Sequence, residues 1–194
     1  MCLFGLPGAG KSACLKLIRD LFENCFDWED GVQFQFLAPQ NTMAALVGGK
    51  TVHAWGCIPV NATDAANKLH GKPEEGDVDE LFLNALGIRW LLFDEGSALA
   101  LSLLGTLDGY LRRACKKHPY ALRGRTPRPF GGINVLVAGD LWQLPPVQAN
   151  AIFSNPCKVG QMYSSEEQQI QKTFWKLADD SIQRTFILSQ SLRT

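Results

Sequence analysis

The sequence predicts a three-layer α/β domain of the phosphate-loop (P-loop) kind, with a mostly parallel sheet between layers of helices. A glycine-rich phosphate-loop motif at residues 5–12 follows a short apolar run. Two later apolar runs, residues 88–93 and 133–138, each end in acidic or polar residues, as buried parallel strands do. Helical patterns alternate with these strands along 194 residues, a length that suits one sizeable domain.

The phosphate loop reads GLPGAGKS and matches G-x-x-x-x-G-K-[ST] in full. Glycines let the backbone curl so that successive N–H groups point at one phosphate chain. We expect Gly8, Ala9 and Gly10 to contact phosphate in this way. Lys11 should reach the β- and γ-phosphates of ATP, and the Ser12 hydroxyl should ligate Mg²⁺.

The elements around the loop follow from periodicity and turn residues. Residues 2–4 predict the strand before the loop, and residues 32–38 predict a second strand. A short helix is expected over residues 43–47, capped by Thr42. Residues 58–76, with Pro, Asn and acids, predict a surface excursion. The first helix should bury one face, formed by Cys14, Leu17, Ile18, Leu21, Phe22 and Cys25.

Two acids end the apolar run at residues 88–93. Asp94 and Glu95 there fit a buried strand that presents carboxylates at its C-terminal end. Asp94 should hold Mg²⁺ through water, because Mg²⁺ prefers hard oxygen ligands. Glu95 should orient or deprotonate the attacking water. The alternative is a solvated Asp-Glu turn, which the intact phosphate loop disfavours.

The next helical pattern ends in a basic run. Its apolar face is formed by Leu99, Leu103, Leu107, Tyr110, Leu111 and Ala114. Residues 112–128 contain seven Lys or Arg and no acid. Cations suit a helix C-terminus, so one interpretation is a solvated helix end. The other is contact with nucleic-acid phosphates, through Arg112, Arg113, Arg123 and Arg125.

The strand predicted at residues 133–138 leads into a second polar segment. Gln143, just past that strand, is placed to sense a γ-phosphate or its attacking water. Pro145 and Pro146 bar a helix there. A capping-box start at residues 165–168 predicts a helix that continues through Ala178. Residues 186–188 predict a last strand.

Composition excludes few functions. The formal net charge is zero, so no global field indicates a nucleic-acid partner. The six cysteines are scattered without a C-x-x-C, which favours reduced thiols in an intracellular protein. No run of about 18 apolar residues occurs, so no membrane span is predicted. Because only four residues precede the phosphate loop, we expect the chain to be a fragment.

The order of these motifs resembles the Pif-type DNA helicases, superfamily-one motors of the RecD-like branch that include the helicase half of Helitron transposons. The resemblance covers essentially the whole chain. Beyond the phosphate loop, it is carried by Ala38-Pro39 with Ala44-Ala45, Gly49, Thr51 and His53, by Asp94-Glu95 with Ser97, by PFGGI at residues 129–133, by Gly139-Asp140 with QLPPV at residues 143–147, and by LSQSLR at residues 188–193.

This resemblance implies a P-loop NTPase (RecA-like) fold and an ATP-dependent 5′–3′ motor on single-stranded DNA. It implies a charge-stabilising arginine at Arg193 and DNA contacts at Thr51 and His53. Without the resemblance, a satisfied, partly buried histidine is the preferred interpretation of His53. The family further implies work in DNA repair, recombination and telomere maintenance, and a nuclear location, with mitochondrion or cytoplasm open.

The chain departs from the family pattern at two places. Gln40 and Asn41 stand where the family usually has Thr-Gly, which bears on the local DNA contact. Gly96 and Ala98 flank Ser97, and a glycine loosens a helix start by up to about 1 kcal/mol.

Residues 1–194 are predicted to form one motor domain, whereas a helicase holds ATP between two. No second-domain motif follows Arg193, so we expect a second motor domain as an outside partner, slow hydrolysis and no unwinding by this chain alone. Two alternatives remain. One is another nucleotide hydrolase or kinase on the same fold. The other is a truncated or decayed remnant that binds nucleotide or DNA without turnover.

Overall fold

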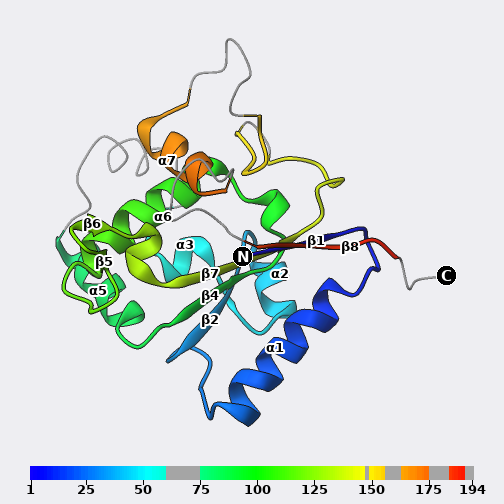
Figure 1. The fold of residues 1–194 in the computed structure, drawn as a ribbon, viewed down its shortest axis with the longest axis horizontal. Coiled ribbons are helices and arrows are strands. Elements are labelled where there is room, and N and C mark those ends of the chain that lie inside the picture. The colour runs from blue at the N-terminus through cyan, green and yellow to red at the C-terminus, as the bar shows by residue number, and fades with distance from the viewer. Residues whose placement is uncertain (60–74, 147–148, 156–162, 175–183, 191–194) are drawn as a thin grey trace.

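A parallel β-sheet organises the chain. The computed structural model describes residues 1–59, 75–146, 149–155, 163–174 and 184–190. The six-stranded sheet has the order β3-β2-β4-β7-β1-β8, and its neighbouring strands pair in parallel (Figure 1). The strands are β1 (Cys2–Gly5), β2 (Phe34–Ala38), β3 (Lys50–Thr51), β4 (Trp90–Phe93), β7 (Asn134–Gly139) and β8 (Thr185–Leu188). The predicted α/β class is confirmed.

Helices cover both faces of the sheet. Helix α1 (Lys11–Cys25) packs on one face against Phe34 and Phe36 of β2. Helices α3 (Val52–Trp55), α5 (Glu75–Ala85) and α6 (Leu101–Ala114) pack on the other. The sheet separates two hydrophobic cores, because successive side chains of a strand point to opposite faces. Leu91 and Phe93 of β4 join the core beneath α3, α5 and α6, whereas Leu92 joins the core beneath α1.

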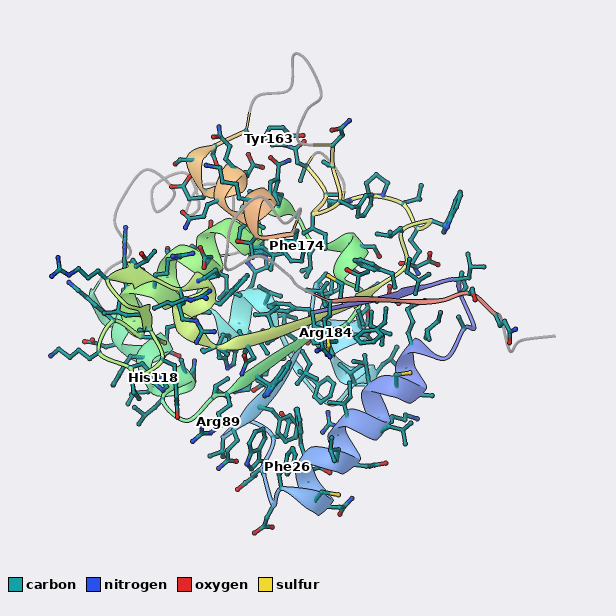
Figure 2. The ribbon with its side chains drawn as sticks, viewed as in Figure 1. Phe26, Arg89, His118, Tyr163, Phe174 and Arg184 are labelled. Carbon is teal, nitrogen blue, oxygen red and sulfur yellow. The ribbon has the colours of Figure 1, made fainter. Side chains whose placement is uncertain are left out.

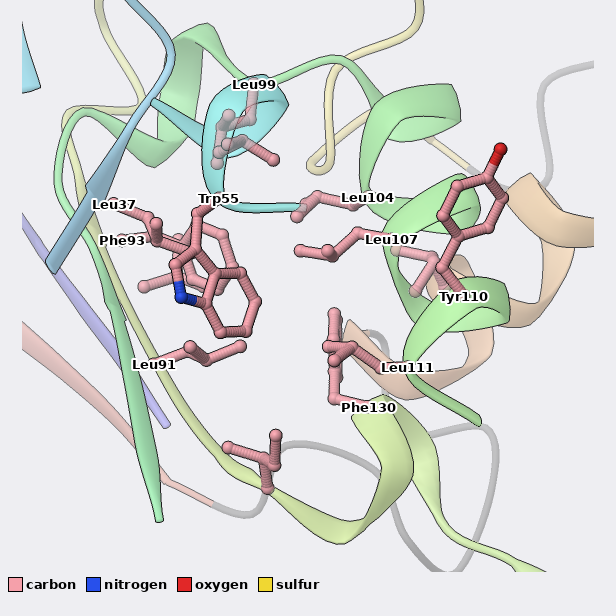
Figure 3. Packing of buried hydrophobic residues seen from close by; sticks show 14 of the residues in the cluster. Leu37, Trp55, Leu91, Phe93, Leu99, Leu104, Leu107, Tyr110, Leu111 and Phe130 are labelled. Atoms are coloured by element: carbon pink, nitrogen blue, oxygen red, sulfur yellow. The ribbon is translucent and has the colours of Figure 1, made fainter. Parts of the chain in front are cut away.

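The larger core lies between the sheet and α6. Trp55, only 1% exposed, stands between Leu91 and Phe93 of β4 and the leucines of α6, of which Leu107 is fully buried (Figure 3). Helix α7 (Ser165–Phe174) packs on the outer side of α6, where Ile170 is fully buried. This packing holds β4 and β7 rigidly, and with them the loops at their carboxyl ends.

The predicted buried face of α1 is confirmed in part: Phe22 is buried, and Cys14 and Ile18 pack partly buried against the same core, but the prediction is wrong at three positions. Leu15 and Phe22 are buried, whereas Leu17 is 67% exposed and Leu21 is 44% exposed; Cys25 is also exposed. The Phe22 ring lies 5.1 Å from the ring centroid of Phe34 in β2 and contacts further aromatic rings. This tertiary aromatic cluster sets the rotation of the helix, which apolar spacing alone does not reveal.

Several element boundaries differ from the predictions. The short helix α2 (Asn41–Leu46) begins after Gln40, so Thr42 lies inside it and does not cap it. Helix α6 begins at Leu101, and the buried Leu99 precedes it. The capping box lies one residue earlier than predicted: the Glu167 amide donates to Ser164 Oγ at 3.2 Å, and the Ser164 amide donates to the Glu167 carboxylate at 2.9 Å.

Several elements were not predicted, among them β3, α3, one longer helix and a hairpin. Helix α5 was not expected, and it starts within the predicted surface excursion, of which residues 60–74 lie outside the described part of the chain. The arginine-rich loop forms an antiparallel hairpin of β5 (Leu122–Arg123) and β6 (Thr126–Pro127). Leu177 and Ala178 of the predicted last helix also lie outside the described residues. Within the described residues, no helix combines the length and apolarity needed to cross a bilayer.

Candidate nucleotide-binding site

The predicted phosphate loop joins β1 to α1, at the carboxyl edge of the sheet (Figure 1). Gly8 and Gly10 have φ angles of 76° and 95°, a left-handed backbone that glycine adopts without steric cost. Helix α1 starts directly after Gly10. Its first backbone amides have no partner one turn earlier, so they can bind an anion.

Lys11 folds back on its own loop. Its Nζ donates hydrogen bonds to the carbonyl oxygens of Gly5 at 2.7 Å and Leu6 at 3.0 Å. Both acceptors are neutral backbone carbonyls, and a phosphate oxygen is a stronger, charged acceptor for the same ammonium group. The loop therefore holds a lysine that can turn to a phosphate chain when one is bound.

The acidic pair lies at the end of β4 beside this loop. Burial raises the pKa of Asp94, and a hydrogen bond from the Glu95 amide (2.9 Å) and the charge of Lys11 oppose that shift. Burial also raises the pKa of Glu95, and the neighbouring Asp94 charge raises it further. Lys11 and a hydrogen bond from Gln143 lower it. The two carboxylates and the lysine thus share one electrostatic site.

Glu95 has a left-handed backbone, with φ 50° and ψ 39°. This conformation is uncommon for a residue other than glycine and costs of order 1 kcal/mol. Its Oε2 atom is buried and makes no hydrogen bond to the described residues. A strained backbone thus holds a carboxylate whose Oε2 atom is buried and has no hydrogen-bond partner among the described residues.

The segment after β7 completes the cluster. Ser97 is fully buried, and its Oγ donates to Gln143 Oε1 at 3.2 Å and accepts from the Asp140 amide at 3.4 Å. Asp140 is fully buried too, and its Oδ2 has no partner among the described residues. Ser97 and Asp140 had no predicted role. The signal for Asp140 was available, because it follows a buried strand just as Asp94 does.

Gly96 allows this close packing. A β-carbon at Gly96 would overlap Cγ1 of Val137 in β7, so the glycine lets the turn after β4 lie directly on the neighbouring strand. Gly96, which departs from the family pattern and was expected to loosen a helix start, therefore has a packing reason. Beside the site, Trp142 and Leu144 flank Gln143 and are 85% and 87% exposed.

The chemistry of the donor set fits Mg²⁺. Ser12, Asp94 and Glu95 line one hollow of about 440 Å³, which brings hydroxyl and carboxylate oxygens to the phosphate loop. No group of three or more His, Cys, Asp or Glu side chains in the described residues could hold a metal ion by itself. Proteins usually bind Mg²⁺ through one or two carboxylates together with water and nucleotide phosphates, and Ser12 and Asp94 could supply the protein oxygens.

The predicted DNA contacts fall at two separate places. Thr51 ends β3 at the carboxyl edge, and its Oγ1 accepts from the Ala54 amide at 3.1 Å. His53 Nδ1 lies 3.2 Å from the carbonyl oxygen of Ile58. The predicted basic contacts lie instead at the end of α6 and in the β5–β6 hairpin. Arg193 lies outside the described residues.

Arg112 is held by structural contacts. Its Nε donates to the buried Asp108 Oδ2 at 2.7 Å, and its Nη1 donates to the carbonyl oxygen of Pro127 at 2.9 Å. Asp108 Oδ1 also accepts from the amide of Phe130. Arg112 therefore braces the hairpin against α6, whereas Arg113 and Arg125 are exposed.

Known proteins share both the sequence and the fold. The ATP-dependent DNA helicase PIF1 of Saccharomyces cerevisiae is 31% identical over 143 residues, which is 74% of this chain and 15% of the yeast protein. The yeast ATP-dependent DNA helicase RRM3 is 27% identical over 74% of this chain and 18% of its own length. This chain thus spans less than a fifth of these relatives.

Solved structures extend the likeness to nearly the whole chain. The Pif1 helicase from Candida albicans aligns with a TM-score of 0.63 and 24% identity, over 98% of this chain and 36% of that one. Bacteroides Pif1 helicase, solved in complex with ADP-AlF3 and single-stranded DNA, aligns with a TM-score of 0.57 and 25% identity over 98% and 38%. The model of the family described as PIF1-like helicase matches residues 3–175, and this chain belongs to that family.

Proposed function

We propose that this chain is the nucleotide-hydrolysing motor domain of an ATP-dependent 5′–3′ DNA helicase. The convergence of Lys11, Asp94, Glu95 and Gln143 at the carboxyl edge of the sheet carries the proposal. These residues come from the ends of three different strands, which is the usual place for a ligand site in an open α/β sheet. Family membership adds the helicase activity.

Each residue then has a role in hydrolysis. The curled loop Gly8–Ala9–Gly10 holds the phosphate chain, while Lys11 leaves its carbonyl partners and binds the β- and γ-phosphates. Ser12 directly, and Asp94 through water, would hold Mg²⁺, and the bound ion would neutralise phosphate charge.

Glu95 and Gln143 act on the attacking water. Glu95 accepts its proton through the unpaired, buried carboxylate oxygen, and a raised pKa suits a general base. Gln143, which hydrogen-bonds Ser97, orients the same water and senses the γ-phosphate.

The DNA strand runs past Thr51 and His53, which lie at the same edge of the sheet as the nucleotide site. A Bacteroides relative has been solved with ADP-AlF3 and single-stranded DNA, which supports both ligands. A second motor domain supplies the other half of the cleft, and Arg193 has the charge-stabilising role that the family motif implies. We place the protein in the nucleus, a location in keeping with its likeness to yeast ATP-dependent DNA helicases.

The test is ATP hydrolysis with and without single-stranded DNA. Glu95→Gln serves as the blank, and the exposed Glu80→Gln in α5 is the matched control. We expect slow turnover that DNA stimulates, lost in Glu95→Gln and kept in Glu80→Gln. Because the second motor domain, and any arginine that it supplies, is absent from the assay, the hydrolysis rate should be lower than that of a complete motor by a factor of roughly 10³–10⁵.

The other outcomes point to the two alternatives. DNA-independent turnover would indicate another hydrolase on this fold. Mg²⁺-dependent ATP binding without turnover in any variant would indicate a remnant that binds nucleotide only.

A further inference from the structure

A long groove follows the amino edge of the sheet, opposite the nucleotide site. It consists of three adjoining hollows of about 270, 550 and 720 Å³. The first two share Trp90, Ile133 and Asn134, at the starts of β4 and β7, and Arg128, which follows β6. The second and third share Arg123, Pro129 and Thr173, between the β5–β6 hairpin and α7. We call these three hollows the amino-edge groove.

The amino-edge groove is cationic. Its basic lining residues are Arg89, Arg112, Arg123, Arg128 and Lys172. None of its described lining residues is an Asp or Glu. The acids at the start of α7 bond locally instead: Glu166 accepts from Ser165, and Glu167 accepts from the Ser164 amide. Because Arg112 is paired with Asp108, the positive charge of the described lining comes from the other four basic residues.

One end of the groove is aromatic. Trp28, Trp90, His118 and Tyr120 line its smallest hollow. Tyr120 is 47% exposed, and the Arg89 guanidinium lies 5.8 Å from its ring centroid, with Nη1 3.4 Å from the hydroxyl oxygen. Figure 2 shows Arg89 and His118 at the end of the molecule where Figure 1 places the hairpin. Aromatic rings and arginine planes are platforms on which unpaired bases stack.

This groove is separate from the nucleotide site. Strand β7 begins at Asn134 in the groove and ends at Gly139, next to the buried Asp140 of the site. At 3.3 Å per residue, the five steps between its ends span about 17 Å. Thr51, a proposed contact on the DNA track, lies at the opposite edge from the groove.

We propose that the amino-edge groove binds a single strand of nucleic acid, independently of bound nucleotide. Phosphates lie along Arg123 and Lys172, and bases stack at the end formed by Tyr120. The combination of a cationic channel with aromatic rings is the arrangement that sequence-tolerant single-strand binding uses. Arg112 keeps the hairpin in place through Asp108 and Pro127, and Arg128 Nη1 donates to the Tyr120 carbonyl oxygen at 3.4 Å.

The test is fluorescence anisotropy of a labelled oligothymidine, without ATP, over a range of salt concentrations. The double variant Arg123→Ala/Lys172→Ala removes two exposed cations of the groove. Each phosphate contact contributes about 0.7 to the slope of log K against log salt. Losing two phosphate contacts should make this negative slope shallower by about 1.4 and weaken binding roughly 25-fold at 0.1 M salt.

Matched controls separate the groove from general charge. Lys116→Ala/Lys117→Ala removes two exposed cations at the same end of the molecule that do not line the groove, and it should bind as the parent does. Tyr120→Ala should weaken binding at least about fivefold, whereas Tyr120→Phe keeps the stacking ring. The proposal would be overturned if Lys116→Ala/Lys117→Ala lost as much affinity as Arg123→Ala/Lys172→Ala. It would also be overturned if the chain bound duplex DNA more tightly than a single strand.

A third variant keeps this proposal distinct from the proposed function. Thr51→Ala/His53→Ala changes the DNA track at the carboxyl edge and should leave groove binding intact. If that variant abolishes all binding while Arg123→Ala/Lys172→Ala changes nothing, the track exists and the groove proposal is wrong. If the parent chain binds the oligothymidine through Arg123 and Lys172 but DNA does not stimulate its ATP hydrolysis, the proposed function is wrong and the groove proposal stands.

Discussion

Replacing Gly96 by alanine tests how the catalytic turn is packed. The new β-carbon would overlap Cγ1 of Val137 and lie 3.1 Å from the carbonyl oxygen of Ala138. Val137 is fully buried and β-branched, so its side chain cannot swing away. Overpacking of this kind costs about 1–3 kcal/mol. For a domain of this size, 1 kcal/mol corresponds to about 2–4 °C, so we expect Tm to fall by roughly 2–12 °C.

Gly109→Ala in α6 is the matched control, because a β-carbon there meets nothing within 4 Å. Replacing this helical glycine should stabilise the fold by about 0.5–1 kcal/mol. Thermal unfolding of both variants, followed by circular dichroism, gives opposite signs if the packing argument holds. Adding Val137→Ala to Gly96→Ala should cost less than the sum of the single changes. Equal Tm values for the Gly96 and Gly109 variants would refute the reasoning.

Three further predictions concern single side chains. Lys11→Ala should abolish ATP binding measured by calorimetry, and an unchanged affinity would contradict the phosphate-loop assignment. Turnover should fall on acidification at a pH above the ordinary glutamate value of 4.5, because burial raises the pKa of Glu95 and a general base must be deprotonated; a pH–rate profile checks this. Asp108→Ala should lower the free energy of unfolding, measured by urea denaturation, by about 3–5 kcal/mol, because it leaves the half-buried Arg112 without its carboxylate partner. The control Asp20→Ala, at an exposed position, should change this free energy by less than about 0.5 kcal/mol.

Local patterns were enough to predict the sheet and much of the site. The apolar run before Asp94 and the glycines of the phosphate loop encode their own conformation, because strand burial and left-handed turns depend on nearby residues. Their convergence follows from parallel strands ending at one edge. The residue roles themselves remain predictions.

Long-range contacts account for what the sequence did not reveal. The rotation of α1 depends on Phe22 packing against Phe34 of β2, whereas apolar spacing predicted Leu17, not Leu15, on the buried face. The basic run at residues 112–128 is continuous in sequence, but Arg112 donates a hydrogen bond to the buried Asp108 and has a structural role. The position of Asp140 after a buried strand was visible in the sequence, but its complete burial required the fold, because it comes from the packing of the Ser97 turn against β7.

The exposed indole beside Gln143 makes the protein its own optical probe. Trp142 is 85% exposed, whereas Trp55 is buried in the core and Trp28 and Trp90 are half-buried. Any ligand or domain that closes over the γ-phosphate end of the site must change the solvent around Trp142, and its emission should shift to shorter wavelength. Stopped-flow fluorescence of the unlabelled chain could therefore time each closing and reopening of the site within a single turnover. Trp142→Phe, which keeps the other four tryptophans, gives the background emission to subtract.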